Sequence, residues 1–492
     1  MKHLFYSFLL LAFSLELFAQ APKEEVRAVW LTTNHSLDWP SKPYRNSNDI
    51  NIQQDELIDI LDQLKAANFN VVFLQTRLRG DVIYNSNIEP VSSHIRTVVN
   101  TWSKYDPLAF AVAECHKRGL ECHAWIVTYP LGPERINGRE NNSPTIRKNK
   151  DKISRFGNEF YLDPGNPNTT TYLVSLIEEI VDKYDIDGIH MDYIRYPDKS
   201  ENFPDNATYR LYGGGKNKSD WRRENINNFV YQVYDVVKSK KPWVQVSSSV
   251  AGMYNTLSNN TQKHWTAFHS VYQDPEDWLK KGKHDFIVPM MYFSDDLFFP
   301  FLNDWKARSN ERYIIPGLGV YQMDAKESNW QPQVIKEQVQ STRDHQLKGN
   351  AFYRTKHLVN NTKGIMNLLT QNFYQHPSVL PPLTWLNDVV PVPPINIKAM
   401  ATGMYMFVSW EEIDQPEDKK VFYNVYRSKT LPIDINNAEN LIATRVKDKI
   451  LFVPIDKSVE TAYYYAVTSS DRYRNESIIS HPVYFVTGNF EK

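Results

Sequence analysis

Short apolar runs alternate with segments of helical period through most of the chain. The apolar runs predict strands at residues 26–32, 70–76 and 121–127, within 185–197, and at 243–249, 285–293, 312–317 and 349–353. Apolar residues at three- and four-residue spacing predict helices at 55–67, 107–118, 171–184, 221–238, 301–308, 334–347 and 364–374. Several runs are almost continuously apolar, which is typical of strands buried on both faces of a parallel sheet.

Eight strand-then-helix units are what a (β/α)8 TIM barrel requires, and we place this barrel at residues 22–385. Two long polar segments, 128–160 and 197–220, are expected to be enlarged loops. The rival fold is an open doubly wound sheet. It would normally show a glycine-rich first turn, and none follows Thr32. The barrel is therefore favoured.

The pattern changes after a stiff segment at Pro391, Pro393 and Pro394. Short alternating runs at 395–399, 404–410, 421–427, 451–454, 462–469 and 483–486 predict an all-β sandwich over residues 391–488. The runs around Trp410, 423–429 and 463–467 resemble a fibronectin type III module, a small immunoglobulin-like sandwich. No catalytic constellation is apparent there, so a spacer or binding module is expected.

The first nineteen residues are typical of a cleavable signal peptide. Lys2 and His3 supply charge, 4–18 is apolar, and Ala19 and Ala21 flank the expected cleavage position. The apolar run is too short for a comfortable membrane span. No Cys lies near it, so no lipid anchor is expected. We therefore expect a secreted or periplasmic product without a transmembrane segment.

Composition narrows the function classes. The net charge of -1 argues against nucleic acid as a partner. The 29 Tyr and 12 Trp suit a carbohydrate binder, and suit a large core equally well. The only cysteines, Cys115 and Cys122, exclude a disulfide scaffold and a cysteine-based zinc site. They could form one bridge, but two buried thiols are favoured.

Candidate carboxylates lie where predicted strands end, because barrel chemistry occurs at the carboxyl ends of the strands. Hydrolysing a glycosidic bond needs an acid and a second group at the anomeric carbon. Asp192 ends the fourth strand and Asp81 follows the second, so they are the favoured pair. The structural alternatives are ion pairs, Asp192 with Arg195 and Asp81 with Arg77 or Arg79. The other carboxylates considered are Glu134, Asp163, Asp187, Asp295 and Asp296, with Asp187 and Asp163 expected to be structural.

Polar and aromatic residues near the same strand ends are candidates for substrate binding. They are Arg77, His123, Trp125, Tyr193, Arg195 and Tyr292. His190 lies inside its strand and is expected to be a core residue. His123, Trp125 and Asp192 make no convincing metal set, so neither a metal nor another cofactor is expected.

Six segments occur in an order that carries a family resemblance: 25–33 (EVRAVWLTT), the end of the second strand from Gln75 to Asp81, 123–127 (HAWIV), 161–165 (YLDPG), 187–197 (DGIHMDYIRYP) and 288–293 (VPMMYF). Together they resemble the bacterial family-10 glycosyl-hydrolase-like proteins over residues 24–380. The resemblance implies a secreted or envelope-attached (β/α)8 glycosidase. It also implies an amino-sugar polysaccharide substrate, especially peptidoglycan glycan strands without stem peptides.

The sequence of the fourth strand differs from the pattern of the family it resembles. The family usually carries paired acids where this chain has Asp192 and Tyr193. The strand is also similar to that of chitinase-type hydrolases, but Ile194 stands where their acid would be. This leaves Asp192 as the expected general acid, with Asp81 or the substrate's own acetamido group as the second group. The alternatives are a non-catalytic carbohydrate-binding barrel and a hydrolase of a scavenged plant or host polysaccharide.

Overall fold

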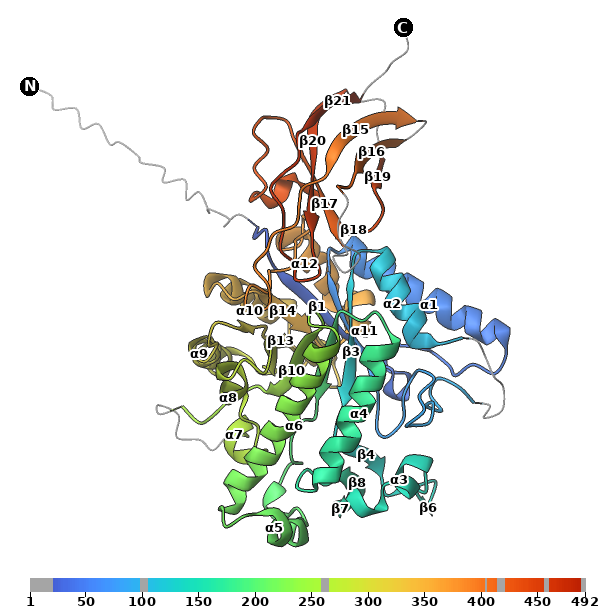
Figure 1. The fold of residues 1–492 in the computed structure, drawn as a ribbon, viewed down its shortest axis with the longest axis vertical. Coiled ribbons are helices and arrows are strands. Elements are labelled where there is room, and N and C mark those ends of the chain that lie inside the picture. Colours follow the sequence, from blue (N-terminus) through green and yellow to red (C-terminus); the bar gives the residue numbers. More distant parts are fainter. Residues whose placement is uncertain are drawn as a thin grey trace, which may run out of the picture.

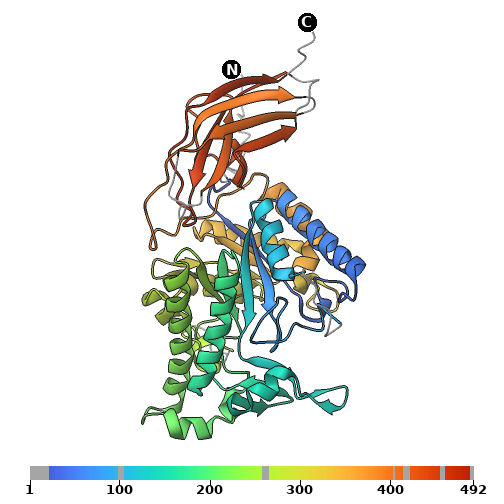
Figure 2. The ribbon, with the colours of Figure 1, turned by 45° about the vertical axis from the view of Figure 1, so that its right-hand side comes forward.

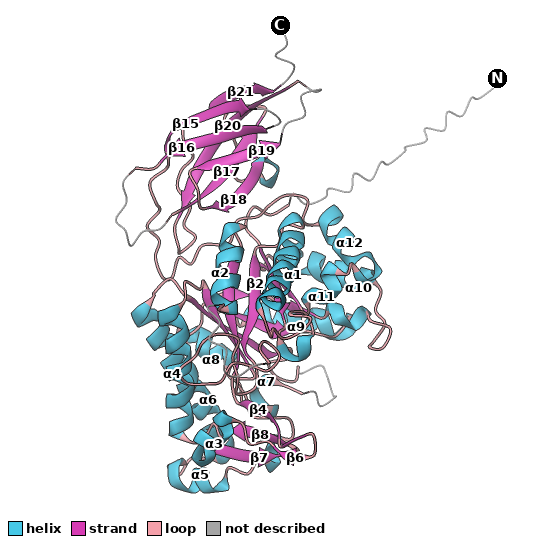
Figure 3. Cartoon of the chain, turned by 90° about the vertical axis from the view of Figure 1, so that its right-hand side faces the viewer, coloured by secondary structure: helices cyan, strands magenta, loops and turns pink. Residues whose placement is uncertain are grey.

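The computed structural model describes residues 21–97, 105–257, 265–402, 405–413, 421–454 and 460–487. The predicted signal peptide lies outside these residues. The chain forms a barrel with a smaller β-sandwich at one end (Figure 1). Helices surround the barrel strands, whereas the sandwich is almost entirely strand (Figure 3). None of the described helices is both long and apolar enough to cross a bilayer.

Eight parallel strand positions close the barrel. They are β1 (Val26–Leu31), β2 (Val71–Arg77), β3 (Glu121–Val127), β9 (Gly188–Asp192), β10 (Gln245–Ala251), β11 (Phe286–Met290), a seventh position split into β12 (Tyr313–Ile314) and β13 (Gly317–Leu318), and β14 (Gly349–Phe352). Pairing of β14 with β1 closes the ring. The seventh strand is interrupted at Pro316, which has no N–H for the ladder. The TIM barrel prediction is confirmed, and the open sheet is excluded.

The main helices occur where the apolar period predicts them. They are α1 (Ser47–Ala66), α2 (Pro107–Lys117), α4 (Pro167–Lys183), α6 (Lys218–Lys240), α9 (Asp295–Ala307), α10 (Pro332–Asp344) and α12 (Ile365–Asn372), with shorter helices α5 (Asn206–Tyr212), α7 (Ala267–Ser270), α8 (Pro275–Lys280) and α11 (Thr355–Val359). Helix α1 begins eight residues before the predicted start. Its N-cap Asn46 accepts a hydrogen bond from the Asp49 N–H, which starts the helix within a polar stretch.

The barrel has an unusually polar and aromatic interior. Trp30, Phe73 and Trp125 pack inside it, while aliphatic and aromatic residues together fill the layer between strands and helices. The ring of His190 stacks on Phe73 at 4.0 Å and accepts a hydrogen bond from Trp30 Nε1. His190 is therefore a core residue, as its position within the strand indicates.

The segment after β3 is folded, contrary to the expectation of a long loop. It forms a small antiparallel sheet of β4 (Pro130–Pro133), β8 (Glu159–Leu162) and β7 (Ile153–Phe156), a hairpin of β5 (Arg135–Ile136) and β6 (Arg139–Glu140), and helix α3 (Pro144–Lys148). We call residues 128–163 the insertion. It lies at the end of the barrel opposite the sandwich (Figure 1).

The C-terminal module is the predicted sandwich. One sheet holds β15 (Ile395–Thr402), β16 (Tyr405–Glu411) and β19 (Ile450–Pro454); the other holds β18 (Leu441–Val446), β17 (Phe422–Ser428), β20 (Thr461–Ser470) and β21 (Val483–Thr487). Figure 2 shows the sandwich seated on one end of the barrel. Arg445 and Arg474 of the sandwich both pair with Glu121 at the start of β3. The sandwich therefore covers the amino-terminal end of the barrel strands.

Candidate active site

Asp192 is the last residue of β9 and lies at the carboxyl end of the barrel. Its side chain accepts hydrogen bonds from Trp125 Nε1 at 3.2 Å and from the Tyr193 N–H at 2.7 Å. Burial raises the pKa of Asp192, and the nearby Arg195 only partly opposes that rise. A buried carboxyl with a raised pKa can hold a proton for transfer to a leaving oxygen.

Tyr193 turns the chain sharply after this carboxylate. Its φ of 52° lies in the left-handed region, which non-glycine residues adopt rarely. The turn brings Arg195 back beside Tyr193, so that the guanidinium lies 4.6 Å from the Tyr193 ring centroid. The indole of Trp265 covers the guanidinium as well, at 4.9 Å. Arg195 is thus held between two aromatic rings next to Asp192.

Three tyrosines form an aromatic wall at the same end. Tyr292, Tyr321 and Tyr353 follow β11, β13 and β14, and their ring centroids lie 5.6–5.7 Å apart. Burial raises the pKa of Tyr292 well above its ordinary value, and the Asp192 charge contributes to this rise. Tyr292 therefore lies near the carboxylate, as predicted, and sugar rings can stack on such a wall.

A second carboxylate enters from the insertion. Glu159 pairs with Arg79 Nη1 at 2.5 Å and accepts a hydrogen bond from the Tyr161 hydroxyl at 3.0 Å. Arg79 also favours the ionised form of Asp192 and so lowers its pKa. Glu159, Tyr161, Tyr321, Tyr353 and Trp265 are absent from the predicted site. Their positions after strand ends could mark Tyr321 and Tyr353, but only the fold of the insertion brings Glu159 to this end of the barrel.

Two predicted substrate-binding residues have other roles. Arg77 is fully buried, and its guanidinium binds Glu89 through Nε and Nη2 and the Thr128 carbonyl through Nη1. His123 is fully buried below Trp125, with Nε2 3.1 Å from a Glu121 oxygen. Neither side chain faces an open site. In this structure both side chains brace the barrel, and their binding of substrate stays a prediction.

The Asp81 carboxylate accepts hydrogen bonds from Ser92 and from the chain beside it. The Arg79 N–H donates to its carboxylate at 3.3 Å, and no contact within the described chain joins Asp81 to Asp192. Burial raises the pKa of Asp81, while a hydrogen bond from Ser92 opposes the rise.

The remaining carboxylates are accounted for separately. Asp163 accepts hydrogen bonds from the Gly165 N–H and the Thr208 hydroxyl, as a turn residue would. Glu134 pairs with Arg155. The side chains of Asp295 and Asp296 lie outside the described part of the structure.

No group of three His, Cys, Asp or Glu within the described ranges could hold a metal ion. Cys115 and Cys122 are two buried free thiols. A hydrogen bond between them and burial both raise the pKa of Cys122.

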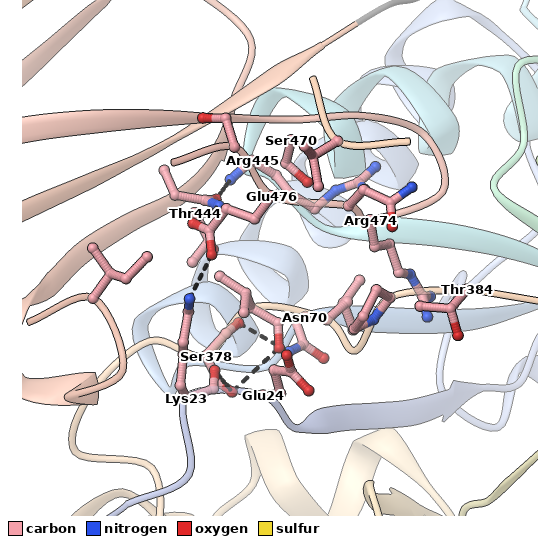
Figure 4. A pocket seen from close by; sticks show the side chains of 18 of the residues that line it. Lys23, Glu24, Asn70, Ser378, Thr384, Thr444, Arg445, Ser470, Arg474 and Glu476 are labelled. Atoms are coloured by element: carbon pink, nitrogen blue, oxygen red, sulfur yellow. Dashed lines mark hydrogen bonds and ion pairs between the residues drawn. The ribbon is translucent and has the colours of Figure 1, made fainter. Parts of the chain in front are cut away.

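A cavity of about 340 Å³ lies at the other end, between barrel and sandwich (Figure 4). Its charged groups are largely matched to one another: Lys23 pairs with Glu476 at 2.6 Å, and Arg445 with Glu121 at 3.0 Å. Reactions in TIM barrels occur at the carboxyl ends of the strands. The candidate active site is therefore the group of residues around Asp192 and not this cavity.

Comparison with known proteins agrees with this architecture. The chain is 30% identical to the glycosyl hydrolase YngK of Bacillus subtilis, covering 92% of each chain. It is 32% identical to the glycosyl hydrolase DigH of Escherichia coli, over 68% of this chain and 75% of that protein.

The catalytic domain of a β-amylase from Paenibacillus polymyxa superposes with a TM-score of 0.50 at 12% identity, over 73% of this chain and 99% of that one. At this identity the likeness shows the barrel fold alone. The family model for glycosyl hydrolase-like 10 matches residues 25–325, which span the barrel from β1 through β13. The chain belongs to the glycosyl hydrolase-like 10 family.

Proposed function

We propose that the chain is a secreted glycoside hydrolase that cleaves an amino-sugar polysaccharide, with peptidoglycan glycan strands as the substrate. Asp192 is the general acid. The observation that carries this role is its buried carboxyl group at the carboxyl end of β9, held by Trp125 and Tyr193. The aromatic wall of Tyr292, Tyr321 and Tyr353 supports a sugar as the ligand.

The second group in this proposal is the acetamido oxygen of the substrate. It attacks the anomeric carbon while Asp192 protonates the leaving oxygen, and water then opens the resulting ring. Asp81, the alternative, makes no contact with Asp192 among the described residues. We expect Asp81→Asn to keep more than about a tenth of the wild-type kcat, whereas a fall of 10²-fold or more would assign Asp81 to the chemistry.

The test is release of reducing ends by the purified chain from denuded peptidoglycan, chitin oligomers and plant polysaccharides. Cleavage of the first that falls at least about 10²-fold in Asp192→Asn supports the proposal. Binding without cleavage of any of them would identify a carbohydrate-binding barrel. Preferential cleavage of plant polysaccharide would identify a scavenging hydrolase. Export is tested by sequencing the N-terminus of the cell-made product, expected at Gln20 or Ala21.

A further inference from the structure

The Arg195 guanidinium carries a buried donor without a partner. Its Nη1 atom is inaccessible to solvent and has no hydrogen-bond acceptor among the described residues. A buried donor left unpaired costs about 1–3 kcal/mol, more when it is charged. Such a cost is expected where a ligand supplies the missing acceptor.

The surroundings of Arg195 fix the guanidinium before any ligand arrives. The rings of Tyr193 and Trp265 cover it at 4.6 and 4.9 Å, and the Arg195 N–H donates to the Tyr193 carbonyl at 2.8 Å. Because the rings cover the faces of the guanidinium, its N–H groups can form hydrogen bonds only along its edge. A planar, immobilised edge matches a carboxylate better than a hydroxyl, because two parallel charge-assisted bonds can form.

Two other arginines in this region have acceptors for their guanidinium N–H groups. Arg223 also stacks on an aromatic ring, with its guanidinium 4.2 Å from the Phe268 centroid. It nevertheless pairs with Asp220 and donates to the Phe268 carbonyl. Arg79 pairs with Glu159. Arg195 thus combines proximity to Asp192, two covering rings and an unused buried donor.

We propose that Arg195 binds a carboxylate carried by the substrate sugar, and that it thereby selects acidic glycans over neutral ones. This inference deepens the proposed function by naming the group that is recognised. In denuded peptidoglycan that group is the lactyl carboxylate of N-acetylmuramic acid, which a stem peptide would convert to an uncharged amide. A uronic acid presents the same chemistry from a different polymer.

The test measures binding to full-length chain carrying Asp192→Asn, so that ligands persist. The ligands are N-acetylglucosamine–N-acetylmuramic acid oligomers, the same oligomers with amidated lactyl groups, chitin oligomers of equal length and oligogalacturonate. Isothermal titration should show the free-acid muramyl oligomers binding about ten-fold or more tighter than the amidated and chitin oligomers. If oligogalacturonate binds more tightly, Arg195 still recognises a carboxylate, but the carboxylate belongs to a uronic acid and not to N-acetylmuramic acid.

Adding Arg195→Gln should abolish this preference. Arg195→Lys should lose most of it, because a lysine keeps the charge but not the planar edge. Arg223→Gln is the matched control and should retain the full preference. Equal affinity for acidic and neutral oligomers, or a preference that survives Arg195→Gln with an unchanged melting temperature, would overturn the proposal.

Cleavage of the same oligomers is measured separately with chain that retains Asp192. Cleavage without an acid preference refutes the role of Arg195 and leaves the glycosidase proposal standing. A preference for acidic oligomers without cleavage supports the role of Arg195 and refutes the glycosidase proposal. No binding of any oligomer refutes both.

Discussion

Burial raises the pKa of Asp192, and Trp125 is one of the groups that oppose this rise. Its indole N–H favours the charged carboxylate and so lowers the pKa of Asp192, against the rise caused by burial. Trp125→Phe removes this donor and should raise the pKa further. Because a general acid works when protonated, the basic limb of the kcat/KM profile should move to higher pH. A limb that stayed in place or moved to lower pH would contradict the role of Asp192.

The Arg77–Glu89 pair fixes the end of β2. Both side chains are fully buried, and the Tyr172 hydroxyl donates to the same carboxylate. Glu89→Gln leaves the arginine without its countercharge, and a buried pair broken on one side loses about 3–5 kcal/mol. Urea denaturation should show this fall in the free energy of unfolding. Replacing both partners with apolar residues should cost less, and an equal or larger loss would rule out the charge explanation.

At the scale of elements, the insertion sets the charge balance around Asp192. Glu159 on β8 neutralises Arg79, which in turn favours ionised Asp192. Glu159→Gln leaves the charge of Arg79 uncompensated and should lower the pKa of Asp192. The basic limb of the pH profile should then move to lower pH, opposite to the effect of Trp125→Phe. Glu134→Gln, which breaks the exposed pair with Arg155, should leave the profile unchanged.

Elements with a strong apolar pattern could be predicted from the sequence, and polar ones could not. Several barrel strands, such as β1 and β2, are almost continuously apolar, whereas β8 and β18 have only three apolar residues in a row and are bordered by polar ones. Asp192 could be found because it ends a buried strand. Glu159 and Trp265 meet it only through folded loops. The full burial of Arg77 and His123 could not be predicted, because a strand pattern does not show how deep in the barrel a side chain lies.

At the scale of the whole molecule, the sandwich supplies countercharges to acidic residues at the amino-terminal end of the barrel strands. Burial would raise the pKa of Glu121, but Arg474 and Arg445 outweigh it and hold the pKa well below its ordinary value. Arg445 also pairs with Asp187, which has the structural role expected of it. The glycine that ends α2, Gly119, is tightly covered, since a Cβ there would lie 2.5 Å from the Thr444 carbonyl oxygen.

Removing one of these arginines should destabilise the barrel itself. Arg474→Gln is expected to lower the melting temperature, and adding Glu121→Gln should restore part of the loss because it removes a buried carboxylate that has lost one of its two arginine partners. Since the folded-state pKa of Glu121 is depressed, its stabilising contribution is present above pH 4.5 and is lost as the pH falls below that value. Thermal melts of the four variants between pH 3 and pH 7 test both effects. If the two substitutions change the melting temperature by simply additive amounts, the pairing of Arg474 with Glu121 does not stabilise the barrel in this way.

The placement of the sandwich also gives the molecule a direction. Figure 2 shows the sandwich at the end of the barrel opposite the insertion, whereas Asp192 ends β9 at the carboxyl end of the strands. An attachment made through the sandwich would therefore leave the carboxyl end of the barrel facing away from the surface that holds it. A long polymer could then lie across Asp192 and extend past the barrel without meeting the C-terminal module.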